Sequence, residues 1–128
     1  MHAIRVTSGG KWDHSVDIEK KWSSLEEGKV SNLRTGANQS NHLRIIILGD
    51  SGAFYVNGQF ISSLDTSGIP LKGDVCVATG TYNNNEIKGE VTRFKDFTVW
   101  SLDTPIFGPS KSGLRHKEDG SIKTFKVA

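Results

Sequence analysis

The chain is poor in cysteine and proline and lacks any long apolar run. Its one cysteine among 128 residues excludes an internal disulfide and a cysteine-clustered zinc site. The lone Cys76 alternates with Val75 and Val77, a pattern that predicts a small buried hydrophobe. No segment approaches the roughly 20 apolar residues of a membrane-spanning helix. The N-terminus shows no signal peptide, so we expect a soluble protein whose compartment the sequence leaves open.

Net charge is also nearly absent. Sixteen basic and fourteen acidic residues leave +2, which is too little and too dispersed to favour nucleic acid or an anionic membrane as a partner. Glycine, by contrast, occurs fourteen times, which indicates many tight turns. The length suits one domain that can bury its own core.

The most informative stretch lies between Leu43 and Leu64. Its apolar, β-branched runs are interrupted twice by turn residues, at Gly49 to Gly52 and at Asn57-Gly58. An Asn-Gly pair between apolar runs is the strongest short-range hairpin signal, because both central residues of a type I′ turn need positive φ. The stretch therefore predicts a three-stranded antiparallel meander over residues 43–48, 53–56 and 59–64.

Most of the remaining chain also shows short alternating runs joined by turn signals, with almost no helical pattern. The segment 19–28 is predicted to be a loop with a half-buried Trp22. A bulge near Lys95-Asp96 would restore the alternation of the apolar residues around it. We expect a first hairpin and then further short strands, at residues 3–7 and 11–18 and at 29–33, 74–79, 90–100 and 121–127.

These patterns predict an all-β fold, an antiparallel two-sheet β-sandwich. Residues 1–102 would form the sandwich domain. From Asp103 the chain loses periodicity, so residues 103–128 are predicted to be a C-terminal extension made of a connector and an edge strand. Every second side chain of each strand is expected to face the interior, including Phe54, Val56, Phe94 and Val99.

Three blocks of sequence resemble a known family. The blocks are NHLRIIILGDSGAFYVNGQFISSLD, GDVCVATG and GEVTRFKDFTVW, in that order. At this spacing they resemble the concanavalin A-like, laminin G-like jelly-roll domains of bacterial multidomain proteins, over a range from about Ile4 to Trp100. The resemblance implies a jelly-roll topology. It also leaves calcium open as a ligand, because modules of this kind often bind calcium through loop oxygens.

The chain departs from this family at its start. Such domains usually carry further strands before the segment that resembles AIRVTSGGKW. A sheet without those strands would expose unpaired backbone and apolar surface, which native proteins normally cover. Three explanations stay open: the segment 107–127 fills the vacancy, a second copy does so by pairing edges, or the chain is a piece of a longer protein. We favour a homodimer.

Catalytic and metal-binding patterns are missing from the sequence. It contains neither the E-x-D-x-x-E triplet of the retaining glucanases on this fold nor a G-x-S-x-G nucleophile elbow. The four histidines show no metal-ligand spacing, and His14 can form a polar pair with Asp13. Apart from the calcium that the resemblance leaves open, we assign no catalytic residue, metal ligand or cofactor. The aspartates in predicted turns are interpreted as turn residues, namely Asp50, Asp65 and Asp74.

Binding needs less than catalysis, because sugar recognition requires only an exposed aromatic face and a few amide or carboxylate partners. The residues that could supply these are Trp12, Trp22, Tyr55, Tyr82, Asn83, Asn84 and Asn85. Trp12 and Trp22 equally suit a core or an interface. The sequence favours a non-catalytic module that binds a glycan or a protein. The alternatives are a glycan hydrolase whose acids converge from separate strands and a purely structural or oligomerisation module.

Overall fold

The computed structural model describes residues 1–68, 73–82, 89, 91–102 and 120–124. These residues form only strands and irregular connections, without a helix. All strand pairs are antiparallel, which confirms the predicted all-β class. In chain order the strands are β1 (His2–Val6), β2 (Lys11–Ile18), β3 (Lys21–Lys29), β4 (Leu43–Leu48), β5 (Ser51–Val56), β6 (Gln59–Asp65), β7 (Thr98–Leu102) and β8 (Gly120–Thr124).

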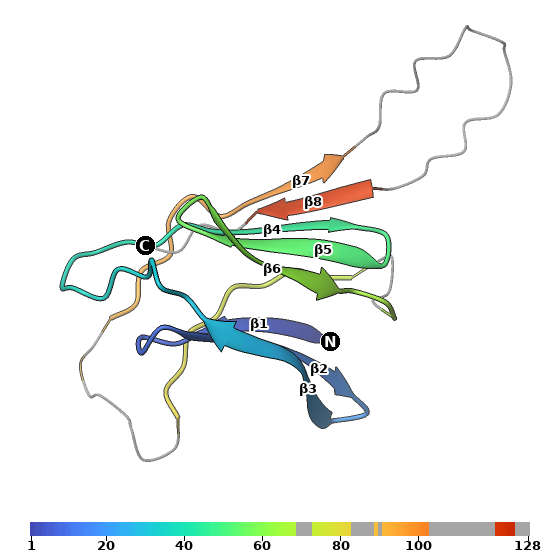
Figure 1. Ribbon diagram of the computed structural model, residues 1–128, viewed down its shortest axis with the longest axis horizontal. Helices are drawn as coiled ribbons and strands as arrows, with labels where there is room; N and C mark the ends of the chain where they lie inside the picture. The colour runs from blue at the N-terminus through green and yellow to red at the C-terminus, as the bar shows by residue number, and fades with distance from the viewer. Residues whose placement is uncertain (69–72, 83–88, 90, 103–119, 125–128) are drawn as a thin grey trace, which may run out of the picture.

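The strands form two sheets that pack against each other as in a β-sandwich. The smaller sheet has the order β1-β2-β3, and the larger has the order β6-β5-β4-β8-β7. Figure 1 shows the larger sheet above the smaller one. Strand β8 lies between β4 and β7, so the extension that was predicted to carry an edge strand contributes an inner strand to the larger sheet.

The central meander forms as predicted. β4 and β5 pair from Leu43 opposite Val56 to Leu48 opposite Ser51, and β6 returns along β5. At the second turn, Asn57 and Gly58 have φ values of 51° and 84°, the positive pair that a type I′ hairpin requires.

The first hairpin is also confirmed, but the strand that follows it was missed. Residues 19–28 were predicted to be a loop, and instead β3 pairs along the whole of β2. The turn that makes this pairing possible is Glu19-Lys20, whose φ values are 53° and 67°. Left-handed geometry at two non-glycine residues carries no sequence signal of the Asn-Gly kind. The predicted strand at 29–33 is accordingly wrong, because Lys29 ends β3.

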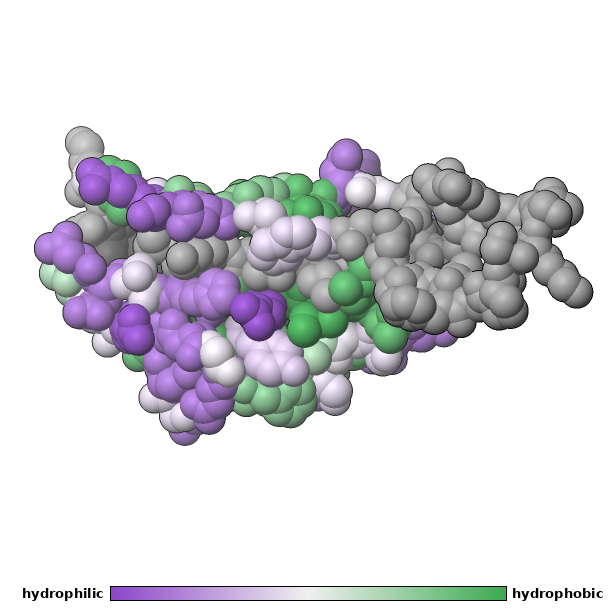
Figure 2. All heavy atoms as spheres, turned by 90° about the horizontal axis from the view of Figure 1, so that it is seen from above, coloured by the Kyte–Doolittle hydropathy of each residue, from purple (hydrophilic) through white to green (hydrophobic). Residues whose placement is uncertain are grey.

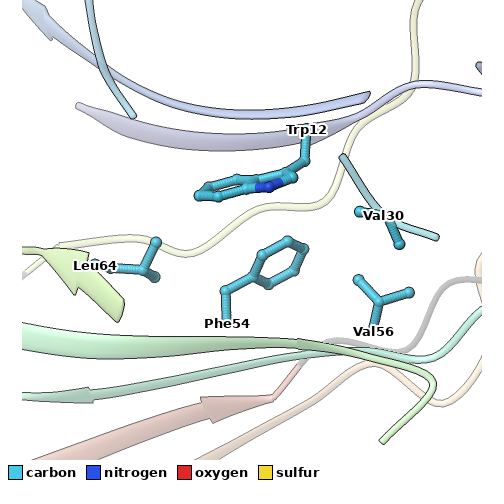
Figure 3. Packing of buried hydrophobic residues seen from close by; sticks show 5 residues of the cluster. All are labelled: Trp12, Val30, Phe54, Val56 and Leu64. Carbon is cyan, nitrogen blue, oxygen red and sulfur yellow. The ribbon is translucent and has the colours of Figure 1, made fainter. Parts of the chain in front are cut away.

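The core lies between the two sheets. Figure 3 shows Trp12 pointing from β2 toward Phe54 on β5, and their ring centroids are 5.5 Å apart. Removing each large apolar side chain from water stabilises the fold by about 1.5–3 kcal/mol. The fully enclosed hydrophobic residues are Trp12, Val30, Phe54, Val56 and Leu64.

Two of the four predicted core residues lie outside this core. Phe54 and Val56 are buried as expected, whereas Phe94 and Val99 are 38% and 45% exposed. The register places Val99 on the same face as Ile45 and Phe54. However, β7 is the outermost strand of a sheet that has five strands against the three of its partner. The smaller sheet is too narrow to cover it.

The segments around β7 depart furthest from the predictions. Residues 73–82 form no strand, and Cys76 is exposed, so its prediction as a buried hydrophobe is wrong. The strand predicted over 90–100 begins only at Thr98. The predicted bulge near Lys95-Asp96 coincides with a φ of 54° at Asp96, where the chain leaves extended geometry before β7 starts.

Three asparagines anchor the connection between the two sheets. The Asn57 side chain accepts a bond from the His42 amide and donates to the Asn32 carbonyl and to Asn41 Oδ1, each at 2.9 Å. Asn32 Nδ2 in turn donates to the Val56 carbonyl at 2.7 Å. The residue that permits the hairpin turn therefore also holds the chain that crosses from β3 to β4.

Candidate functional site

The outer face of the smaller sheet carries an exposed aromatic and charged cluster. The register pairs Arg5 of β1 with Asp13 of β2, and Asp17 of β2 with Trp22 of β3. Directly opposed residues share a face of the sheet, so these side chains project away from the core. We call this cluster the Arg–Trp patch and define it as Arg5, Asp13, Ser15, Asp17 and Trp22.

Arg5 is the centre of the patch. Its Nε lies 3.0 Å from both Asp13 carboxylate oxygens, and its Nη2 donates to Oδ2 at 2.6 Å. The guanidinium carbon also lies 5.7 Å from the centre of the Trp22 ring, within the range of a cation–π contact. The hydrogen bond to Asp13 is the main cause that raises the pKa of Arg5. Both contacts hold a charged group over a half-exposed indole.

Two polar atoms of the patch are buried and have no hydrogen-bond partner among the described residues. They are Ser15 Oγ and Asp17 Oδ1. Strand alternation puts Ser15 on the same face as Asp13 and Asp17, yet Ser15 is only 1% exposed. A buried hydroxyl without a partner costs about 1–3 kcal/mol.

The structure distributes the predicted aromatic ligand residues over three places. Trp22 belongs to the Arg–Trp patch and is 46% exposed. Trp12 was a candidate ligand plate, but it is 5% exposed in the core, so its ring has no face available to a ligand. Tyr55 lies on the outer face of the larger sheet, where its ring meets Phe60 edge-on at 5.6 Å.

Tyr82 is the most exposed of the predicted aromatic residues, at 63%. It is close enough to Arg5 to contribute to the raised pKa of that residue, after the larger effects of Asp13. The predicted partners of Tyr82, namely Asn83, Asn84 and Asn85, lie outside the described residues.

Arg5 and Asp13 give the patch its charge, and neither was predicted from the sequence as a site residue. The signal was present in the predicted first hairpin, because pairing residues 3–7 with 11–18 around a short turn sets Arg5 against Asp13. The predicted pair of His14 with Asp13 is wrong, since alternation along β2 sends His14 toward the core and Asp13 outward.

Within the described part of the chain, no three histidine, cysteine or acidic side chains gather closely enough to hold a metal ion. Asp65 has the turn role that was predicted, because its Oδ1 accepts the Ser67 amide at 2.9 Å. The described residues also contain no helix of the length and apolarity needed to cross a membrane.

Comparison of the chain with protein-family models, with curated proteins and with solved structures finds no match. Inference about function therefore depends on the chemistry of the patch.

Proposed function

We propose that this chain is a non-catalytic binding module of the concanavalin A-like, laminin G-like jelly-roll type, and that it binds a glycan at the Arg–Trp patch. One observation carries the proposal: a half-exposed indole ring lies beside a charged guanidinium that a neighbouring carboxylate holds in place. The packing of two antiparallel sheets as a sandwich is compatible with the proposed fold family.

The patch offers the contacts that a sugar ring needs. The apolar C–H face of a pyranose can stack on the Trp22 ring, as other apolar groups do on aromatic faces. The bonds from Arg5 to Asp13 use Nε and Nη2, which leaves the Nη1 donors for ligand hydroxyls. Asp13 retains lone pairs that can accept from such hydroxyls, and its side chain is 19% exposed.

The test is a glycan array followed by titration calorimetry with a glycan that binds. Trp22→Ala should weaken affinity at least tenfold, because it removes the stacking surface, and Arg5→Ala should do the same by removing donors. Phe94→Ala is the matched control, since it removes a partly exposed ring that belongs neither to the Arg–Trp patch nor to the dimer face proposed below. Absence of any binding glycan, or an unchanged affinity in Trp22→Ala, would refute the proposal.

A glycan hydrolase is the second candidate, and one observation favours it. The register sets Glu27 directly opposite Asp13 across β2 and β3, so both carboxyl groups project from the same face of the sheet on neighbouring strands. Retaining glycosidases place two carboxyl groups about 5–5.5 Å apart. Hydrolysis of an array glycan by the wild-type protein, abolished in Glu27→Gln, would establish this candidate in place of simple binding.

We further propose a homodimer formed through the outer face of the larger sheet. Figure 2 shows several groups of hydrophobic side chains on the molecule's upper surface, with hydrophilic ones concentrated toward its left end. Register places Leu48, Phe60 and Trp100 on one outward face, and each is at least half exposed. Two identical sheets can cover these residues mutually across a two-fold axis.

Analytical ultracentrifugation tests this dimer. The wild-type protein should sediment as a dimer and Trp100→Asp should shift it toward monomer, because a charge at a packed apolar interface is costly. Trp22→Asp, on the other sheet, is the control and should remain dimeric. A wild-type protein that stays monomeric at high concentration would contradict the proposal.

A further inference from the structure

Two histidines meet on the inner face of the smaller sheet. His2 Nδ1 of β1 and His14 Nε2 of β2 are 3.0 Å apart, and their ring centroids are 5.2 Å apart. His14 is only 1% exposed. Its other nitrogen, Nδ1, is buried without a hydrogen-bond partner among the described residues. His14 is therefore held in a place where solvent cannot readily stabilise a charge, whereas His2 is only partly buried.

The pair lies beside a cleft where the two sheets meet. The cleft has a volume of about 230 Å³ and brings together β2, β3 and β6 through His14, Leu25, Glu26, Ser63 and Asp65. Next to it, Ser62 Oγ of β6 donates to Glu26 Oε1 of β3 at 3.0 Å. This bond joins the edge of one sheet to the edge of the other.

The hydrogen bond between His2 Nδ1 and His14 Nε2 exists only while one of these two facing nitrogens lacks a hydrogen. One shared proton lets a nitrogen of one ring donate to a nitrogen of the other. When both rings are protonated, both facing nitrogens carry hydrogen and both rings carry charge. The hydrogen bond is then lost and replaced by repulsion.

We propose that the His2–His14 pair is a pH-sensitive latch, which holds the start of β1 on the smaller sheet at neutral pH and releases it on acidification. Release would also loosen the neighbouring contact between β3 and β6. This inference concerns the inner face of the sheet and does not depend on the proposed glycan site.

Nearby charges act on the two histidines in opposite directions. Glu26 on β3, Asp65 on β6 and Asp13 on β2 all favour a positive charge on His14, whereas the N-terminal ammonium group disfavours one on His2. Burial is the largest effect on both rings, and the pKa of each is lowered as a result. Hydrogen bonds from Ser67 lower the pKa of Asp65, so this carboxylate remains charged and can attract a released imidazolium.

The sign of the pH dependence follows from these directions. A histidine whose pKa is lower in the folded state binds fewer protons there than in the unfolded chain. The stability that it contributes is complete above the ordinary value of 6.5 and declines as the pH falls below it. We therefore expect the latch to open when the pH falls below 6.5, the ordinary pKa of histidine.

The experiment combines histidine NMR titration with thermal unfolding between pH 7.5 and 5. In the wild-type protein, Tm should fall across this range as the His2 and His14 resonances titrate below 6.5. The protection factors of the β1 amides, which correct for the pH dependence of intrinsic exchange, should fall at least tenfold over the same range. His2→Gln and the double variant His2→Gln/His14→Gln should lose most of the fall in Tm, because glutamine can donate a hydrogen bond and cannot titrate. His116→Gln removes a histidine outside the pair and is the control.

Two outcomes would overturn the latch. One is a double variant that keeps the wild-type fall in Tm, and the other is a pair of imidazoles that both titrate at 6.5. If the double variant does not fold, His2→Gln alone answers the question, because His2 is only partly buried.

Discussion

Trp12 and Trp22 belong to neighbouring strands of the same sheet but face opposite sides of it. Trp12 is 5% exposed and packs on Phe54, whereas Trp22 is 46% exposed and lies under the Arg5 guanidinium. The same pleated sheet therefore gives one tryptophan to the core and the other to the surface. The comparison teaches that a side chain's place in the strand pairing decides its role, and its residue type alone does not.

The largest expected effect comes from removing the two tryptophan rings in turn and comparing the losses of stability. Trp12→Ala should lower the free energy of unfolding by about 3–5 kcal/mol, because it opens a cavity against Phe54. Trp22→Ala should cost less, about 1–2 kcal/mol, because the half-exposed ring buries only part of its surface and its removal opens no enclosed cavity. Urea denaturation measures both values. Equal losses in the two variants would mean that the outer face is as important to stability as the core.

A smaller loss of stability is expected from adding a methyl group to the inner face of the smaller sheet, which is already tightly packed at Gly28. A Cβ added to Gly28 would lie 2.7 Å from Trp12 Nε1, and the enclosed ring cannot move away. Gly28→Ala should therefore destabilise the protein by about 1–3 kcal/mol through overpacking.

The control for this variant is Gly9→Ala in the first hairpin. A Cβ there would meet only Thr7 Oγ1, at 3.9 Å, which is ordinary contact. If Gly28→Ala unfolds at the same urea concentration as Gly9→Ala, the packing around Trp12 is looser than the distances imply.

The sequence supported prediction of the fold wherever a local signal existed. The meander around Asn57-Gly58 was predictable because β-branched runs and an obligatory turn pair agree. Strand β3 was not, because Glu19-Lys20 is an atypical turn pair and Ser23-Ser24 weakens the strand pattern. The exposure of Val99 was equally hidden, since it depends on the unequal widths of the two sheets.

The candidate site was harder to predict than the fold. Trp22 was identified as an exposed aromatic candidate, but Arg5 and Asp13 belong to no motif and meet only through strand register. The His2–His14 contact likewise needs both the register and the burial of the inner face. The Arg5–Asp13 pair was within reach of the predicted first hairpin, whose register sets the two residues opposite each other. The burial of His14 was not, because it depends on how the sheets pack and leaves no pattern in a single sequence.

The hydrogen bonds of Asn57, which hold the connection between the two sheets, provide a further test. The smaller sheet has one buried and one exposed face only while the larger sheet stays packed on it. Asn57→Ala removes three side-chain hydrogen bonds and places alanine at a φ of 51°, so we expect a loss of about 1–3 kcal/mol. Asn57→Gly removes the same bonds and tolerates the φ. A glycine variant as stable as the wild-type protein would show that the bonds contribute little, and urea denaturation distinguishes these cases.

The smallest effect on stability is expected from Arg5→Lys. This variant separates the contribution of the outer face to ligand binding from its contribution to stability. The Arg5 side chain is 52% exposed, and an exposed ion pair contributes only about 0–1 kcal/mol, so urea denaturation should barely change. Lysine keeps the charge but loses the planar fork that reaches Asp13 and stacks on Trp22. Glycan affinity measured by calorimetry should therefore fall several-fold while stability holds. A variant that loses stability and keeps affinity would reverse the roles of the two faces, because Arg5 would then belong to the structural framework and not to the ligand site.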